Sequence, residues 1–263
     1  MPAVDIDLQR NLPWSALGTC ALHLDVDGTL LDIAPTPDSV VVPAGLIDSL
    51  ATVAERLDGA LALVSGRPIS ALDLLFRPLR FAAVGIHGAE VRTAGGPVRT
   101  ADYLSRQLDG VRAALAETIT QWPGAVLEDK GVALALHYRA SQVDERVIGR
   151  ALQEMTILAG PEFALMEGKR VYEIKAAALS KASGIAALHG TAPFAGRVPV
   201  CIGDDVTDES AFAYANEARG ISIHVGKSGS TLAQFRVTAP AGVRAWIANL
   251  GDDVITYQKA PRK

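Results

Sequence analysis

The sequence predicts an α/β protein, with a parallel sheet and helices on both of its faces, that is interrupted by an inserted α+β module. Toward both ends of the chain, short apolar runs alternate with stretches in which apolar residues recur at helical spacing. Such alternation favours a parallel sheet with crossover helices. Residues 103–175 instead follow the order helix, strand, strand, twice over. We therefore expect a Rossmann-like core formed by residues 1–102 and 176–263, with residues 103–175 as a separate domain.

The first part of the chain supplies three apolar runs that predict buried strands, at residues 19–24, 60–64 and 80–85. A helix is expected over residues 44–59, because apolar side chains there recur at helical spacing and Gly59 is a natural stop. A shorter helix is expected over residues 68–76, with Pro68 near its first turn. Strands and helices thus alternate along this part.

The inserted module begins with an amphipathic helix predicted over residues 103–122. A second helix, over residues 141–160, opens with Ser141 and Asp144 at the spacing of a capping box and ends at Gly160. Two predicted strands follow each helix, at residues 124–130, 131–139, 162–167 and 170–175. The module is therefore expected to be an open antiparallel sheet with helices on one face.

The alternating pattern returns at Ser180, which is expected to cap a helix over residues 180–190. Further strands are predicted at residues 197–203 and 221–226. Further helices are predicted at residues 207–218 and 242–251. The core is consequently discontinuous in sequence, with the module lying between its two halves.

The composition is typical of a globular protein and argues against nucleic-acid-binding and membrane-spanning classes. Apolar residues make up 49% and charged residues 21% of the 263, as in globular domains, and the net charge is −4. No basic stripe suggests a nucleic-acid partner, and no apolar run reaches the roughly 18 residues of a membrane span. The N-terminus lacks the basic start of a signal peptide, and Cys20 and Cys201 lie in apolar runs typical of reduced core thiols. We expect a cytoplasmic monomer with a small-molecule substrate.

Polar signatures follow three of the predicted core strands. The first strand leads into "DVDGT" at residues 25–29, the second into "SGR" at 65–67, and the strand after the module into "DDVTDE" at 204–209. Lys181 opens the helix that precedes this last strand. Because ligands of parallel sheets bind at the carboxyl ends of the strands, we expect these segments to converge on one crevice.

The aspartates of these segments predict a phosphoryl-transfer site. Five carboxylates cannot share a pocket as unpaired anions, whereas Mg²⁺ would stabilise them; they are Asp25, Asp27, Asp204, Asp205 and Asp208. A strand-end aspartate beside Mg²⁺ can act as a nucleophile, and a carboxylate two residues later can act as a general acid and base.

Phosphate-binding groups are expected on the same loops. Backbone N–H groups and hydroxyls suit phosphate oxygens, and a lysine adds positive charge; the candidates are Gly28, Thr29, Ser65, Gly66 and Lys181. Taken singly, each has another interpretation. The aspartates could form an Asp-Gly turn, Ser65 could cap a helix, Lys181 could be a solvated helix start, and Arg67 could form a surface ion pair.

Taken together, the four segments resemble the motifs of the haloacid dehalogenase (HAD) superfamily of phosphatases. Longer stretches resemble the trehalose-6-phosphate phosphatase family within it, and the similarity runs from about Ala21 to Gly226. They are "GIHGAE" (85–90), "LEDKGVALALHYR" (127–139), "MEGKRVYEIK" (166–175) and "GDDVTDE" (203–209). Two positions depart from the family pattern: Ala182 follows Lys181 where glycine is frequent, and Lys175 stands where arginine is more usual.

The resemblance implies a Mg²⁺-dependent hydrolysis of trehalose 6-phosphate to trehalose and phosphate, through an aspartyl-phosphate. Asp25 would be the nucleophile, Asp27 the general acid and base, and Lys181 a third catalytic group. Mg²⁺ would be held by the Asp25 side chain, the Asp27 carbonyl and Asp204, with Asp205 and Asp208 nearby. The module would be a cap that closes over the sugar, and the implied sugar-binding residues are His87, Glu128, Lys130, Arg139 and Glu167.

Two other functions fit part of this pattern. Another capped HAD sugar phosphatase, acting on sucrose 6-phosphate or mannosylphosphoglycerate, would share the core motifs. A non-catalytic sugar-phosphate sensor that partners a synthase would need no nucleophile, and the intact set of Asp25, Asp27, Lys181 and Asp204 argues against it. A functional link between the phosphatase and a trehalose-phosphate synthase is nevertheless expected from the resemblance.

Overall fold

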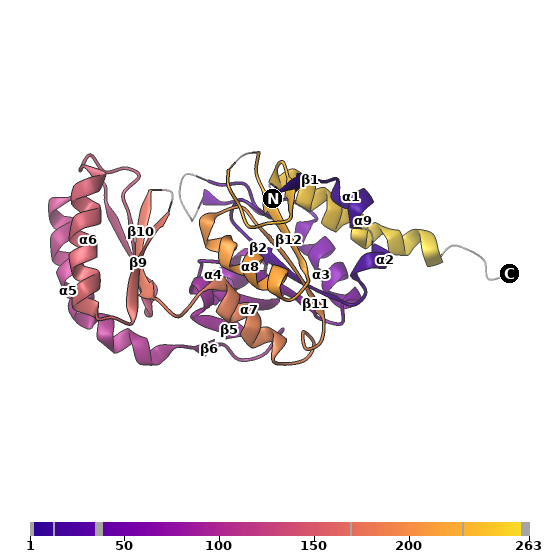
Figure 1. The fold of residues 1–263 in the computed structure, drawn as a ribbon, viewed down its shortest axis with the longest axis horizontal. Helices are drawn as coiled ribbons and strands as arrows, with labels where there is room; N and C mark the ends of the chain where they lie inside the picture. The colour runs from indigo at the N-terminus through magenta and orange to yellow at the C-terminus, as the bar shows by residue number, and fades with distance from the viewer. Residues whose placement is uncertain (1–2, 13, 35–38, 169, 228, 259–263) are drawn as a thin grey trace. The chain divides into compact units, whose positions relative to one another are not determined.

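A computed structural model describes residues 3–12, 14–34, 39–168, 170–227 and 229–258. The chain forms two compact units (Figure 1). One consists of Met1–Arg99 with Ser180–Lys263, and the other of Thr100–Leu179. The predicted boundaries fell at residues 102/103 and 175/176, so the connecting residues on both sides belong to the inserted unit. We refer to the two units as the core and the cap.

The core contains one long sheet, and its strands lie in the order β1-β13-β12-β11-β2-β3-β4-β5-β6. The neighbours from β1 to β4 are parallel, and β5 is antiparallel to β4. The strands are Val4–Asp5 (β1), Cys20–Asp25 (β2), Leu61–Val64 (β3), Ala82–Gly85 (β4), Glu90–Arg92 (β5), Arg99–Thr100 (β6), Val198–Gly203 (β11), Ile221–Val225 (β12) and Phe235–Val237 (β13). All residues of β2, β3 and β4 are buried, as expected for strands covered on both faces.

Helices cover both faces of this sheet. From β2 the chain proceeds through β3 to β4 in one direction, whereas β11, β12 and β13 extend in the other. Because crossover connections between parallel strands are right-handed, the two directions place their helices on opposite faces. Helix α3 contacts α9, and α7 contacts α8. The core helices are Leu8–Asn11 (α1), Trp14–Leu17 (α2), Leu46–Arg56 (α3), Ile69–Leu75 (α4), Lys181–His189 (α7), Glu209–Glu217 (α8) and Pro240–Gln258 (α9).

This arrangement confirms the predicted α/β class and its Rossmann-like topology. The direction of the strand order reverses between β2 and β11, the two central strands. In open sheets of this kind, the crevice at the carboxyl ends of the strands flanking the reversal is the usual ligand site. The first and third predicted motifs follow these two strands.

The cap contains an antiparallel sheet in the order β7-β8-β10-β9, and helices α5 and α6 lie together on one of its faces (Figure 1). Buried leucines of β8 and residues of α5 and α6 form the cap's own hydrophobic core. Its elements are Asp102–Leu108 (η3), Asp109–Thr118 (α5), Ile119–Gln121 (η4), Val126–Asp129 (β7), Ala133–His137 (β8), Glu145–Ala159 (α6), Phe163–Gly168 (β9) and Val171–Ala176 (β10).

The cap helices differ from the prediction at their ends. The first is an α-helix only over α5, because 3-10 turns form on either side of it. The second begins at Glu145, four residues later than predicted. Its N-cap is Asp144, whose carboxylate accepts a hydrogen bond from the backbone N–H of Arg146, while Ser141 accepts from Val143 within the preceding turn. The predicted capping box was therefore wrong, and Asp144 alone caps the helix.

Two histidines form a hydrogen bond between β2 and α7, and of these His23 is buried and His189 half-buried. Nε2 of His23, on β2, lies 2.9 Å from Nε2 of His189, at the end of α7. Burial lowers the pKa of His23 to about 3 and also lowers the pKa of His189, so both rings are neutral in the folded protein near pH 7. One ring donates and the other accepts in this bond, which a proton on both Nε2 atoms would break.

The histidine pair predicts a loss of stability in acid. The unfolding temperature should fall as the pH drops from 6.5, the ordinary histidine value, toward about 4, because the unfolded chain then binds protons that the folded pair does not. His189→Gln should make this fall shallower, since its side-chain carbonyl still accepts from His23 but does not titrate. Thermal unfolding across this pH range tests the prediction, and equal slopes in both proteins would contradict it.

The cysteines and the helices were also the subject of predictions from the sequence. Cys20 and Cys201 are buried thiols on β2 and β11, as expected, and burial raises the pKa of both. Among the described residues, no helix combines the length and the apolar character that crossing a membrane requires.

Candidate active site

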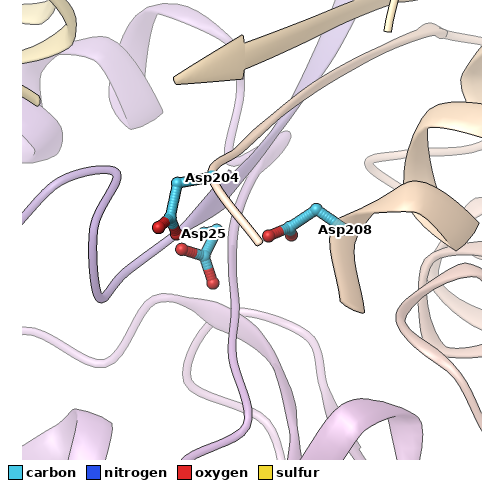
Figure 2. A group of neighbouring side chains, drawn as sticks. All are labelled: Asp25, Asp204 and Asp208. Atoms are coloured by element: carbon cyan, nitrogen blue, oxygen red, sulfur yellow. The ribbon is translucent and has the colours of Figure 1, made fainter. Parts of the chain in front are cut away.

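The carboxyl ends of β2 and β11 bring three aspartates together. Asp25 is the last residue of β2, Asp204 directly follows β11, and Asp208 ends the short 3-10 helix Val206–Asp208 (η5). One carboxylate oxygen from each lies within 4.8 Å of the others, and Figure 2 shows the three side chains gathered around one point. The structure thus brings together three of the five predicted aspartates at a single place.

Two glycines permit this close approach. Gly28 has a φ of +89°, and a Cβ there would lie 2.3 Å from Oδ2 of Asp204. A Cβ on Gly203 would lie 2.1 Å from Cγ of Asp208. Side-chain atoms at these positions would occupy the space of the carboxylates, so the glycines are required by the close approach and, at Gly28, also by the backbone conformation.

Lys181 links two of the aspartates. It is the first residue of α7, which Ser180 and Ser183 begin with a reciprocal capping box. Its Nζ donates to Oδ1 of Asp25 at 2.7 Å and to Oδ1 of Asp208 at 2.6 Å, and the residue is only 2% exposed. Lys181 is therefore a buried charge at the sheet's carboxyl edge rather than a solvated helix start.

Burial sets the direction of the pKa shifts of Asp25 and Asp208 but not that of Lys181. It raises the pKa of Asp25 to about 7, against the lowering effect of Lys181, and raises the pKa of Asp208 for the same reason. Burial alone would lower the pKa of Lys181, but Asp208 and Asp25 outweigh it and raise that pKa. One positive charge thus faces several carboxylates, which leaves the cluster short of positive charge.

A divalent cation fits this cluster. Oδ2 of Asp25 is buried and makes no hydrogen bond with any described residue. It lies beside two other carboxylates, and oxygen-only ligand sets suit hard cations such as Mg²⁺. The shortage of positive charge and the three neighbouring carboxylates are the reasons why a cation fits here.

The predicted phosphate-binding groups lie on the neighbouring loops. Thr29 is fully buried, and its hydroxyl has no hydrogen-bond partner among the described residues. Ser65 directly follows β3, and its hydroxyl accepts a hydrogen bond from the backbone N–H of Arg67. His87, with a φ of +50°, lies against this loop, because a Cβ on Gly66 would be 2.5 Å from its Nε2. The structure therefore places His87 in the core, beside the predicted phosphate loop.

Asp27 and Asp205 have other partners. Arg67 donates from Nε to Oδ2 of Asp27 at 2.6 Å and from a terminal nitrogen to Oδ1 at 2.8 Å. Arg67 and Asp27 therefore form a bidentate contact. The sequence alone does not distinguish such a contact from a surface ion pair. Asp205 begins η5, and its carboxylate accepts from Val206 while its own backbone N–H donates to Asp208. Asp205 thus holds Asp208 in place.

The cap presents a second polar group on the face of its sheet opposite the helices. Glu128 on β7 lies in register with Ala135, which in turn pairs with Glu173 on β10, so the two glutamates share this face. Nζ of Lys130 donates to Glu173 at 2.8 Å, and both side chains are buried. His137 lies 2.8 Å from Glu128, and this hydrogen bond lowers the pKa of the glutamate.

Of the predicted sugar-binding residues, Glu167 does not join this group. Glu167 pairs across the sheet with Tyr172, whose ring belongs to the hydrophobic core under the helices, so Glu167 lies on the opposite face from Glu128. Arg139 follows β8 and is exposed. Glu173 and His137 were not among the residues predicted from the sequence. The alternation within "VYEIKA" was the available signal for Glu173, but assigning its face required the register between β10 and β8.

The chain is similar to known trehalose-phosphatases in both sequence and structure. The family model for trehalose-phosphatases matches residues 23–240. The chain is 44% identical over 230 residues to the trehalose-6-phosphate phosphatase of Escherichia coli (strain K12), covering 86% of this chain and 85% of that protein. A crystal structure of a trehalose-6-phosphate phosphatase related protein has a TM-score of 0.76 at 26% identity, covering 91% of this chain and all of that one.

A more distant structure shows the wider fold. A phosphatase of the haloalkanoate (HAD) enzyme superfamily from Bacteroides thetaiotaomicron has a TM-score of 0.61 at 17% identity, covering 88% of this chain and 95% of that one. The aspartate cluster, Lys181 and the polar face of the cap all lie inside the residues that the family model matches. The fold is similar to that of the HAD phosphatase, and this chain belongs to the trehalose-phosphatase family.

Proposed function

We propose that this protein hydrolyses trehalose 6-phosphate to trehalose and phosphate, through an aspartyl-phosphate and with Mg²⁺. The observation that carries the proposal is Asp25. One of its oxygens is held by the buried Lys181, and the other is without a hydrogen bond among the described residues. A strand-end carboxylate held in this way has one oxygen available for attack on phosphorus.

The reaction proceeds in two steps. Oδ2 of Asp25 attacks the phosphorus atom, the bond between phosphorus and the sugar oxygen breaks, and Asp27 gives that oxygen a proton. Asp27 then takes a proton from water, which attacks the phosphorus of the aspartyl-phosphate and releases phosphate and the Asp25 carboxylate. Lys181 remains beside the reacting oxygens and stabilises the negative charge on the phosphoryl group.

Other groups of the core bind the phosphate and a metal ion. The Thr29 and Ser65 hydroxyls and the backbone N–H groups of Gly28 and Gly66 are the candidate phosphate ligands. Mg²⁺ would be held by the Asp25 and Asp204 carboxylates and the Asp27 carbonyl. When bound, the ion would supply positive charge that offsets the charge of the phosphate.

The polar face of the cap is the candidate sugar-binding surface. Glu128, Lys130 and Glu173 offer charged hydrogen-bonding groups to sugar hydroxyls, and such charge-assisted bonds are strong where water is excluded. The pairing of Lys130 with Glu173 and of His137 with Glu128 orients these groups before a ligand arrives. Because every sugar phosphate carries the same phosphate group, discrimination among sugars is assigned to this face.

A panel of substrates tests the proposal. Phosphate release would be measured from trehalose 6-phosphate, sucrose 6-phosphate, glucose 6-phosphate and mannosylphosphoglycerate, each with Mg²⁺ and with a chelator. We expect turnover of trehalose 6-phosphate above all others, and only with the metal. Preference for another sugar would reassign the substrate, and binding without turnover would favour the sensor function.

A substitution at Gly28 tests the metal assignment. Gly28→Ala places a Cβ within the space of the Asp204 carboxylate and in a strained backbone region. We expect a loss of activity of about tenfold or more, which is ~1.4 kcal/mol of barrier, together with a higher Mg²⁺ concentration for half-maximal rate. Activity would be titrated with Mg²⁺. Gly45→Ala is the control, because Gly45 also has a positive φ but a Cβ there meets open space. An unchanged Mg²⁺ requirement in Gly28→Ala would contradict the assignment.

A further inference from the structure

We propose that Arg67 is a positioning residue for Asp27, and that it holds the Asp27 carboxylate in the orientation that the two proton transfers need. The inference rests on the proposed acid and base role of Asp27. Both nitrogens of the guanidinium edge that faces Asp27 are used, with donor–acceptor distances of 2.6 and 2.8 Å to its two oxygens. Two parallel bonds between planar groups fix both the position and the rotation of the carboxylate.

Arg67 is itself held by the loop that follows β3. Its backbone N–H donates to the Ser65 hydroxyl, and its carbonyl accepts from the backbone N–H of Ile86. A Cβ on Gly85 would lie 3.0 Å from that carbonyl, so β4 approaches the loop closely here. Pro68 follows and begins helix α4. The Arg67 side chain therefore reaches Asp27 from a loop whose backbone is fixed by two hydrogen bonds, one to the Ser65 hydroxyl and one from Ile86.

Asp27 is less confined by its surroundings than Asp25, so its carboxylate needs a partner that fixes its orientation. Asp25 is buried, and its side chain is confined by Lys181. The Asp27 side chain is 35% exposed and follows the end of β2, so burial alone does not confine it to one of the staggered rotamers that side chains adopt. The Arg67 side chain is only 15% exposed. A well-buried guanidinium bound to a partly exposed carboxylate restricts the carboxylate to one of these rotamers.

This contact leaves the acid and base chemistry possible. Each carboxylate oxygen has more than one lone-pair position, so a bond to Arg67 does not prevent the same group from holding a proton. In the first step that proton passes to the sugar oxygen as the oxygen–phosphorus bond breaks. In the second, a proton passes from water to Asp27 as the new oxygen–phosphorus bond forms. Arg67 exchanges no proton in either step, and it contributes through the geometry of Asp27.

A double-mutant cycle tests the inference. Arg67→Ala should lower kcat for trehalose 6-phosphate by about 10- to 100-fold, the usual cost of a misplaced group, with little change in KM. Asp27→Ala should lower kcat by about 10²- to 10⁴-fold. If Arg67 acts through Asp27, adding Arg67→Ala to Asp27→Ala should lower kcat by less than about twofold more, because residues that act as a unit are not additive. Arg67→Lys keeps the charge without the two parallel bonds, and it should fall between Arg67→Ala and wild type.

Arg197 supplies the matched control. Its side chain is 17% exposed and pairs with Asp58 at 3.0 Å, and it also bonds the carbonyl of Cys20 at the opposite end of β2 from Asp25. Arg197→Ala removes an arginine–aspartate pair that lies away from the aspartate cluster. We expect its kcat to stay within about twofold of wild type. Unfolding temperatures of all variants would show whether any loss of rate reflects a loss of fold.

Several results would overturn the inference. They are a kcat for Arg67→Ala close to wild type, an effect confined to KM, or an equal further loss when Arg67→Ala is added to Asp27→Ala. The last result would mean that Arg67 acts on the substrate independently of Asp27. If Asp27→Ala itself keeps the wild-type rate, the acid and base role in the proposed function fails first, and the role of Arg67 falls with it.

Discussion

Asp25→Asn is expected to abolish turnover while leaving the fold intact. The amide is a poor nucleophile, and kcat should fall by at least about 10³-fold, or ~4 kcal/mol of barrier. Stability should be retained because burial already raises the pKa of Asp25 and so favours an uncharged group at this position. Lys181 also keeps its second partner, Asp208. Measurements of kcat and of the unfolding temperature test both parts.

The control for this substitution lies on the same segment. Asp32 is exposed and pairs with Arg244 at 3.2 Å, and Asp32→Asn makes the same chemical change outside the cluster. Its kcat should stay within about twofold of wild type, as for most exposed positions. Residual activity of Asp25→Asn within tenfold of wild type would remove Asp25 from the role of nucleophile.

Glu128→Ala is expected to slow the hydrolysis of the sugar phosphate but not that of a generic phosphate ester. If Glu128 bonds sugar hydroxyls, kcat/KM for trehalose 6-phosphate should fall by about 10²- to 10³-fold, because the site loses a charged partner for those hydroxyls. Hydrolysis of p-nitrophenyl phosphate should change by less than about twofold, since that ester has no sugar to contact. Both values of kcat/KM would be measured in each variant.

Glu167→Ala is the matched control, because Glu167 lies on the helix-covered face of the same sheet. Its two values of kcat/KM should both stay close to wild type. If both substrates lose rate equally in Glu128→Ala, the residue acts through the fold or movement of the cap. If Glu167→Ala instead shows the selective loss, the assignment of faces is reversed. The pair Lys130 and Glu173 is less suitable for single substitutions, because removing one partner leaves the other charge buried and destabilises the cap.

Much of the core could be predicted because its signals are local. Apolar runs marked β2, β3, β4 and β11, and the acidic residues that follow β2 and β11 identified Asp25 and Asp204 as neighbours. Lys181 was added because it opens the helix that precedes β11. Parallel strands place their carboxyl ends at one edge, so strand order and direction were enough to bring these residues together.

Features that depend on register or on side-chain conformation could not be predicted. Glu167 and Glu173 both lie on strands of the cap, and only the pairing of β10 with its neighbours shows which of them shares a face with Glu128. The contact of Arg67 with Asp27 depends on the rotamers of two side chains from different loops. The start of α6 was misplaced because Ser141 and Asp144 are both good caps, and only the structure shows that Ser141 bonds Val143 in the preceding turn while Asp144 caps the helix.

The central position of β2 also has a consequence for how the chain is made. β2 is synthesised before the cap, whereas its neighbour β11 begins at Val198, after the whole cap. Until β11 emerges from the ribosome, one edge of a strand that is fully buried in the folded protein has no partner, and such edges are prone to pair with other chains. The cap, by contrast, is contiguous in sequence and has its own hydrophobic core. We therefore expect the cap to fold during synthesis, before the second half of the core has been made.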